Sequence, residues 1–146
     1  MLKVNAFGYE LLKETVLTQI LGEDSPEILY WIGKQVARNN SLTTMEEIIN
    51  FFDRANWGTL TLTKEKKSEM TFSLSSDLIT NRLDQKISAH FQLEAGFLAQ
   101  QMEYINGCVT ECYEEPKKRN HVVTFTVKWD EKDRIVKEEV TTDTNV

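Results

Sequence analysis

Residues 57–74, with the sequence WGTLTLTKEKKSEMTFSL, mark the point where the spacing of apolar residues changes from helical to extended. In both halves of this stretch apolar residues alternate with threonine or serine, and they stand at Leu60, Leu62, Met70, Phe72 and Leu74. A period of two places successive side chains on opposite faces of a strand. The polar run at residues 64–68 is typical of a connection between paired strands. The stretch therefore predicts a β-hairpin.

Before the hairpin, apolar residues recur at spacings of three and four, which predicts amphipathic helices over about residues 5–21, 25–38 and 43–55. Gly22 is expected to end the first helix. Ser25 is expected to cap the second, with Pro26 in its first turn. Thr43 and Glu46 have the spacing of a capping box at the start of the third. The core face of the second helix is expected to hold Ile28, Leu29, Ile32 and Val36.

After the hairpin, the pattern predicts two helices and two strands, at residues 77–83, about 90–105, 108–114 and 121–130. The longer helix should stop at Asn106-Gly107. No repeat or flexible linker divides the chain, so residues 1–130 are expected to form a single domain. Residues 131–146 form a charged tail, expected to be an edge strand or disordered. The order of elements predicts an α+β fold with helices packed on one face of a four-stranded antiparallel sheet.

Composition narrows the class of protein. The chain has 146 residues, a net charge of -6 and a pI near 5.0. No stretch approaches the roughly 18 consecutive apolar residues of a membrane span, and charged residues interrupt the apolar pattern of the first 20, so no signal peptide is evident. A net negative domain also argues against a nucleic-acid partner, which would need clustered Lys and Arg. We therefore expect a cytoplasmic protein with no membrane span and no nucleic-acid partner.

The residues that could carry chemistry do not form a recognisable catalytic or metal-binding motif. Cys108 and Cys112 are expected to be reduced thiols on one face of a strand, about 13 Å apart, which is too far for a disulfide or for one metal ion. His90 and His121 are the only histidines, too few for the usual histidine-based metal sites. Nucleophile motifs and phosphate-binding glycine loops are absent. The sequence thus indicates no catalytic residue, metal or cofactor, and it favours a role other than enzyme.

Four separated motifs carry a resemblance to a known family. They are Phe7-Gly8-Tyr9-Glu10-Leu11-Leu12, Pro26-Glu27-Ile28-Leu29-Tyr30-Trp31, Trp57-Gly58-Thr59-Leu60 and Phe91-Gln92-Leu93-Glu94-Ala95-Gly96-Phe97-Leu98-Ala99-Gln100-Gln101. In this order they resemble the YslB-like family of small cytosolic proteins from Gram-positive bacteria, over residues 1 to about 130. That family has no established biochemical activity, so the resemblance implies a compartment and a fold but no reaction.

The last part of the chain also resembles, more remotely, the vinyl reductase type ligand-binding domain. That superfamily includes subunits of the TRAPP vesicle-tethering complex and is similar to haem nitric-oxide sensors. The resemblance implies an α+β domain that forms a homodimer through helices and holds an apolar ligand or acyl chain inside. In the vinyl reductase branch one cysteine matches Cys112, and a second cysteine commonly begins the closing strand. This chain has Val122, Val123 and Thr124 at the start of that strand, so only Cys112 matches. The histidine of the haem branch has no counterpart, so neither a metal nor haem is implied.

Three functions remain open at this point. The first is a non-enzymatic binding module that holds a small apolar ligand, with a candidate pocket at Trp57, Phe91, Phe97 and Cys112, although large aromatic residues are more often simply part of a core. The second is a protein-protein interaction subunit with no ligand, which a filled core and an exposed apolar patch on the first two helices would favour. The third is a thiol-dependent redox or acyl-carrying protein that uses Cys112.

Overall fold

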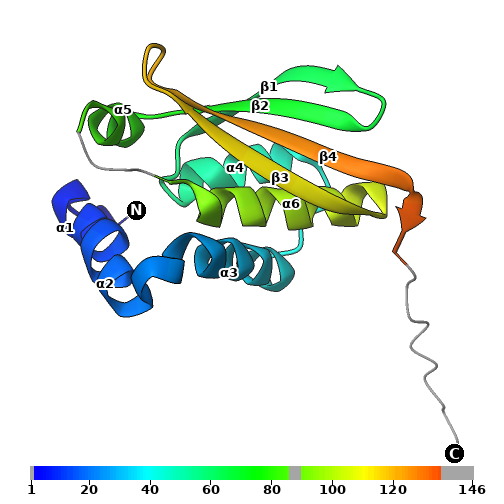
Figure 1. Cartoon of the computed structure of the whole chain (residues 1–146). Helices are drawn as coiled ribbons and strands as arrows, with labels where there is room; N and C mark the ends of the chain where they lie inside the picture. The colour runs from blue at the N-terminus through cyan, green and yellow to red at the C-terminus, as the bar shows by residue number, and fades with distance from the viewer. Residues whose placement is uncertain (1, 86–89, 136–146) are drawn as a thin grey trace, which may run out of the picture.

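The computed structural model describes residues 2–85 and 90–135 and has helices on one side of a single sheet (Figure 1). In chain order its elements are α1 (Ala6–Glu10), the π-helical segment η1 (Leu11–Val16), α2 (Leu17–Leu21), the 3-10 turn η2 (Gly22–Asp24), α3 (Ser25–Asn39), α4 (Met45–Arg54), β1 (Thr59–Lys66), β2 (Glu69–Ser75), α5 (Asp77–Asp84), α6 (Gln92–Asn106), β3 (Cys108–Lys117) and β4 (Val122–Arg134). The predicted fold is confirmed.

The sheet has the strand order β1-β2-β4-β3, and every neighbouring pair is antiparallel. β1 and β3 are therefore its edges. The predicted β-hairpin is present, but β1 continues to Lys66 and β2 begins at Glu69, so the polar run predicted as a long connection is mostly strand. The difference arises because backbone pairing continues after the apolar alternation has ended.

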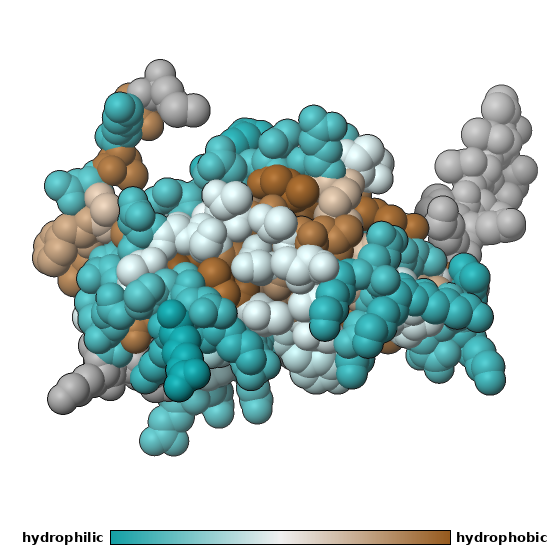
Figure 2. All heavy atoms as spheres, turned by 90° about the horizontal axis from the view of Figure 1, so that it is seen from above, coloured by the Kyte–Doolittle hydropathy of each residue, from teal (hydrophilic) through white to brown (hydrophobic). Residues whose placement is uncertain are grey.

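The two faces of the sheet differ in composition. Phe72, Leu74, Val123, Phe125 and Val127 are buried against α6 and α4. The opposite face, seen from above in Figure 2, has pale residues and smaller brown areas at its centre, with hydrophilic residues around them. Paired positions on that face include Thr61 with Ser73 and Ser73 with Thr124. The hydrophobic core therefore lies on the helical side alone.

Helix α6 lies between the sheet and α3 (Figure 1), which explains why it is buried on almost every side from Glu94 to Met102. It approaches α3 closely through two glycines. A Cβ atom on Gly96 would lie 2.0 Å from the carbonyl oxygen of Tyr30, and one on Gly33 would lie 2.1 Å from that of Leu93. Only glycine permits this backbone contact, and it sets the separation of the two helices.

This contact corrects the predicted core face of α3. Leu29 is buried as predicted and Val36 packs against the core, but Ile32 is 39% exposed, and the other buried positions are Ser25, Gly33 and Ala37. Hydrophobicity favoured the large side chains, but a close helix-helix contact buries the face with the small ones. The first helical stretch differs in a similar way: its apolar face, with Phe7, Leu12 and Ile20, points largely to solvent.

The helix ends are partly as predicted. Gly22 and Gly107 have positive φ angles and cap α2 and α6, as expected. Ser25 is not the N-cap of α3, because that position is Asp24 and the Ser25 hydroxyl is buried without a hydrogen bond to the described residues. For α4 the cap lies one residue later than predicted, since the Thr44 hydroxyl accepts from the Glu47 amide.

The expected C-terminal tail begins inside a strand. Strand β4 extends to Arg134, which pairs with Cys108 at the start of β3. Residues 136–146, the remainder of that tail, lie outside the described residues. Across the part of the chain that the structure describes, no helix is both long enough and apolar enough to cross a membrane.

Candidate functional site

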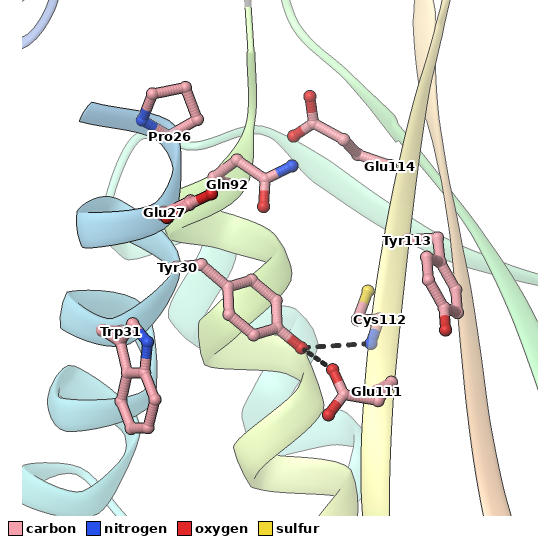
Figure 3. A pocket seen from close by; sticks show the side chains of 9 residues that line it. All are labelled: Pro26, Glu27, Tyr30, Trp31, Gln92, Glu111, Cys112, Tyr113 and Glu114. Atoms are coloured by element: carbon pink, nitrogen blue, oxygen red, sulfur yellow. Dashed lines mark hydrogen bonds between the residues drawn. The ribbon is translucent and has the colours of Figure 1, made fainter. Parts of the chain in front are cut away.

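A groove with a volume of about 500 Å³ lies between α3 and the edge strand β3 (Figure 3). The strand order places β3 at the edge of the sheet, so its free side faces α3. Three elements line the groove: α3 with Pro26, Glu27, Tyr30 and Trp31, the first turn of α6 with Gln92, and β3 with Glu111, Cys112, Tyr113 and Glu114. Aromatic and carboxylate side chains therefore dominate this surface.

Tyr30 connects the two walls of the groove. Its hydroxyl donates to the Glu111 carboxylate at 2.9 Å and accepts from the backbone N–H of Cys112 at 3.3 Å (Figure 3). Burial raises the pKa of the Tyr30 phenol, and the neighbouring Glu111 carboxylate raises it further, so the hydroxyl stays protonated. The bond to Cys112 also satisfies an amide on the free side of β3. Tyr30 therefore protects the sheet edge as well as lining the groove.

Glu114 sits where β3 meets the start of α6. Its carboxylate accepts a hydrogen bond from the backbone N–H of Phe91, the residue that precedes the helix. Burial raises the pKa of Glu114 to about 7, although the bond from Phe91 opposes that shift. Near neutral pH this carboxyl group therefore exchanges between its neutral and charged forms at the wall of the groove.

A lysine of α3 lies over the aromatic side of the groove. The Lys34 ammonium lies 5.0 Å from the centre of the Tyr30 ring and 5.7 Å from that of Trp31. Both distances are within the range of a cation–π contact. Trp31 is also 65% exposed, so a large part of its ring is open to solvent. The groove can thus offer apolar stacking, hydrogen bonding and negative charge to a ligand.

Of the four residues predicted to line a pocket, the structure brings only Cys112 to this groove. Trp57 and Phe97 pack edge to face, with ring centres 5.2 Å apart, in a core cluster that also includes Phe51 and Phe52. Phe91 is buried beneath the Arg82 guanidinium, which lies 4.2 Å from its ring centre. These three aromatic residues belong to the filled interior, where Trp57 and Phe91 line a cavity of only about 20 Å³.

The two cysteines are free and buried. Burial raises the pKa of the Cys112 thiol well above its ordinary value, and the Glu114 and Glu111 carboxylates act in the same direction. Reactive cysteines have the opposite environment, since they are accessible and their pKa is lowered. The surroundings of Cys112 therefore disfavour a thiolate.

A buried ionic network attaches the N-terminal helical segment to the body of the protein. Lys13 contacts Glu94 of α6 at 2.5 Å, and Arg82 of α5 contacts Glu14 at 3.1 Å. Glu94 is only 2% exposed, and the Lys13 ammonium is its ion-pair partner. Among residues 2–85 and 90–135, no group of three or more His, Cys, Asp or Glu side chains is arranged to hold a metal ion.

The sequence did not indicate Tyr30, Trp31, Glu111 and Glu114 as site residues. Tyr30 and Trp31 belong to a motif that supported the family resemblance, but nothing in the pattern shows that they face β3. That juxtaposition depends on the strand order and on the α3–α6 contact. The strand order and the helix contact together bring Tyr30 close to Glu111, which is 81 positions later in the chain.

Two solved structures are similar to this fold. A vinyl-4-reductase family protein from Methanocaldococcus jannaschii matches with a TM-score of 0.65 and 20% identity, over 89% of this chain and 84% of that one. A variant H-NOX protein from K. algicida, in its unliganded Fe(II) form, matches with a TM-score of 0.54 and 13% identity, over 88% and 75% of the two chains. At these identities the likeness concerns the fold, and it agrees with the remote resemblance seen in the sequence.

The sequence comparisons are more specific. The chain is 46% identical over 134 residues to the uncharacterized protein YslB of Bacillus subtilis (strain 168), covering 92% of this chain and 90% of that protein. Residues 6–128 match the model of the family described as "Protein of unknown function (DUF2507)". Since the match includes every described helix and strand at least in part, the chain belongs to the DUF2507 family.

Proposed function

We propose that the protein is a non-enzymatic binding module whose ligand occupies the groove between α3 and β3. The observation that carries this proposal is the groove itself, whose volume of about 500 Å³ falls in the range of small-molecule sites. Its rings offer an apolar surface, and a few polar groups converge on it at defined positions. The ligand we propose has an apolar body that stacks on the exposed ring of Trp31.

The groove is a better candidate than the interior. Phe97, Leu98 and Met102 have no exposed surface and lie in a filled core. A cavity that Lys13, Arg82 and His90 help to line, beneath the N-terminal helical segment, has a volume of only about 20 Å³, room for about one water molecule. A haem group, which the sequence does not imply, would not fit beside His90 for the same reason. We therefore propose a site at the surface.

The two cysteines support a cytoplasmic location and give no support to thiol chemistry. Both cysteines are free, which agrees with a reducing cytoplasm. The raised pKa of Cys112 gives no support to a thiol-dependent role. We therefore propose a cytoplasmic binding protein and not a thiol-dependent redox protein.

Native mass spectrometry of the full chain purified from its own host tests the proposal. We expect a bound mass on the wild-type protein that is lost in Trp31→Ala and kept in Tyr104→Ala. Tyr104 is a suitable control because it is also exposed but does not line the groove. If the protein carries no ligand, and an extract of host metabolites leaves the amide resonances of Gln92 and Cys112 unmoved, the proposal is wrong.

A second candidate function is protein–protein interaction, most simply a homodimer. A filled core and an exposed apolar helical face were the features expected to favour it, and both are present. Phe7 and Ile20 are each 72% exposed and Leu12 is 62% exposed, along one continuous helical stretch. An apolar face of this kind is typical of an interaction site. We propose that a second copy of the chain covers it.

Sedimentation velocity measures this directly. We expect wild-type protein to sediment as a dimer and Leu12→Glu to sediment as a folded monomer. Gln19→Glu adds a carboxylate at an exposed polar position of the same helical stretch and should leave the dimer intact. A wild-type protein that stays monomeric as its concentration is raised would count against a homodimer.

A further inference from the structure

We propose that the groove between α3 and β3 is selective for an organic cation, meaning an ammonium or guanidinium group carried on an apolar body. This inference deepens the proposed function and rests on it. It names the chemical class of the ligand, which neither the fold nor the family description provides. The charges and the rings of the groove carry it independently.

The first observation is unbalanced negative charge. Glu27, Glu111 and Glu114 all line the groove, and no lysine, arginine or histidine does. None of the ion pairs among the described residues includes any of these three carboxylates. Glu114 is half-buried and Glu27 and Glu111 are exposed, and a bound cation would give these carboxylates a partner through charge-assisted contacts.

The second observation is the aromatic wall. The rings of Tyr30 and Trp31 lie on the α3 side of the groove, and such rings attract cations through their negative faces, whereas the Tyr113 ring lies on the far side of β3 (Figure 3). Lys34, which stands just outside it, already holds its ammonium over the rings of Tyr30 and Trp31. Lys34 follows these two residues by four and three positions on α3, so helix geometry places its ammonium within cation–π range of the wall. A ligand cation would compete with Lys34 or use the part of the groove nearer the carboxylates.

The structure disfavours two other occupants. An anionic ligand would face three carboxylates with no basic side chain among the lining residues. An extended peptide could add to β3 as a further strand, but that mode needs free amides on the strand edge. The Cys112 amide is already bonded to Tyr30 and the Thr110 amide to Glu103. The ligand therefore binds through side-chain contacts.

Protonation of Glu114 gives the site a further signature. Its carboxyl group has a pKa raised to about 7 by burial, with Glu94 acting in the same direction and Arg82, Gln92 and the Phe91 amide opposing. A cation binds the charged form better, so its affinity should increase as the pH rises through about 7. A neutral ligand of the same shape should lack this increase.

Three probes with the same apolar body and different charge test the inference. They are 4-phenylbutylammonium, 4-phenylbutanol and 5-phenylpentanoate, which all have four methylenes, titrated into the full chain and followed through the amide resonances of Gln92 and Cys112. We expect the ammonium to bind about tenfold or more tightly than the alcohol, as charge-assisted contacts imply, and the carboxylate to bind most weakly. If the alcohol or the carboxylate binds as well as the ammonium, the cation inference is wrong but groove binding stands. If no probe shifts these resonances at millimolar concentration, the cation inference is wrong, and the groove proposal is decided by native mass spectrometry and the host extract.

Matched variants separate the groove carboxylates from net charge. Glu114→Gln and Glu111→Gln should each weaken binding of the ammonium probe about tenfold. Glu115→Gln removes the same charge from the same strand, but its side chain is exposed and outside the groove, so it should have little effect. Lys34→Gln should strengthen binding, because it removes the competing ammonium. Equal effects of the three glutamate variants, or a weaker affinity in Lys34→Gln, would overturn the inference.

Discussion

Replacement of Gly96 by alanine should destabilise the protein even though alanine is the better helix former. The new Cβ would lie 2.0 Å from the Tyr30 carbonyl oxygen and 2.8 Å from its carbonyl carbon, well inside ordinary van der Waals contact. Both atoms belong to the backbone of α3, so no side-chain rotation can relieve the overlap. Helix α3 must move away from α6, and the buried contacts between the two helices loosen.

The expected magnitude follows from two opposing terms. Overpacking a close-packed interior costs about 1–3 kcal/mol, and a backbone obstacle this close favours the upper end. The gain in helix propensity from glycine to alanine offsets about 1 kcal/mol. We therefore expect the free energy of unfolding to fall by about 2 kcal/mol, with the melting temperature lower by about 4–8 °C for a chain of this size. The Cys112 amide resonance should also shift, because Tyr30 moves with α3.

Chemical denaturation with urea measures the change, and Gly8→Ala is its control. A Cβ on Gly8 would meet nothing within 4 Å, so the same substitution there should be neutral or stabilising by up to about 1 kcal/mol. Both variants exchange a helical glycine for alanine, and they differ in the presence of the obstacle. A Gly96→Ala protein as stable as wild type would refute the close backbone contact between α3 and α6.

Three further predictions concern the buried ionisable groups. The pKa of Glu114 is raised in the folded state, so its contribution to stability is complete below the unfolded pKa near 4.5 and is lost as the pH rises through about 7. The urea midpoint of the wild-type protein should therefore decline over this pH range, and that of Glu114→Gln should not. Parallel pH profiles of the two proteins would contradict this prediction. Lys13→Ala leaves Glu94 buried without its ammonium partner and should lower the free energy of unfolding in urea by about 3 kcal/mol. The double variant Lys13→Met with Glu94→Leu should recover most of this loss. A Lys13→Ala protein as stable as wild type would rule this out. Ellman's reagent should label Cys108 and Cys112 slowly in the folded protein and rapidly in urea, and labelling of the folded protein at the rate of free cysteine would show that the burial is incorrect.

Much of the fold was predictable because its signals are local. The alternation around residues 57–74 predicts β1 and β2, and helical spacing predicts α6 to within two residues at its start and one at its end. Glycines at positions 22 and 107 mark helix ends through a backbone conformation that other residues avoid. These features need only residues that are close in the sequence.

The buried face of α3 was not predictable by the same reasoning. A hydrophobicity pattern gives weight to Ile32, but the contact with α6 depends on Gly33, whose contribution is the absence of a side chain. The exposure of Phe7, Leu12 and Ile20 was equally hidden, because an amphipathic helix can cover its own core or another molecule with the same pattern. The surface that covers an apolar helical face is therefore determined by the tertiary structure and not by the sequence pattern of the helix.

The candidate site depends most on long-range packing. Composition and spacing along the chain are enough to specify an acidic α+β domain and to show that no standard catalytic motif is present. They do not specify that β3 lies at the sheet edge, that α3 lies beside it, or that Tyr30 reaches Glu111 across 81 positions of sequence. Local periodicity follows from the backbone geometry of each element, whereas the groove arises from the order of strand pairing and from two glycines that let helices approach.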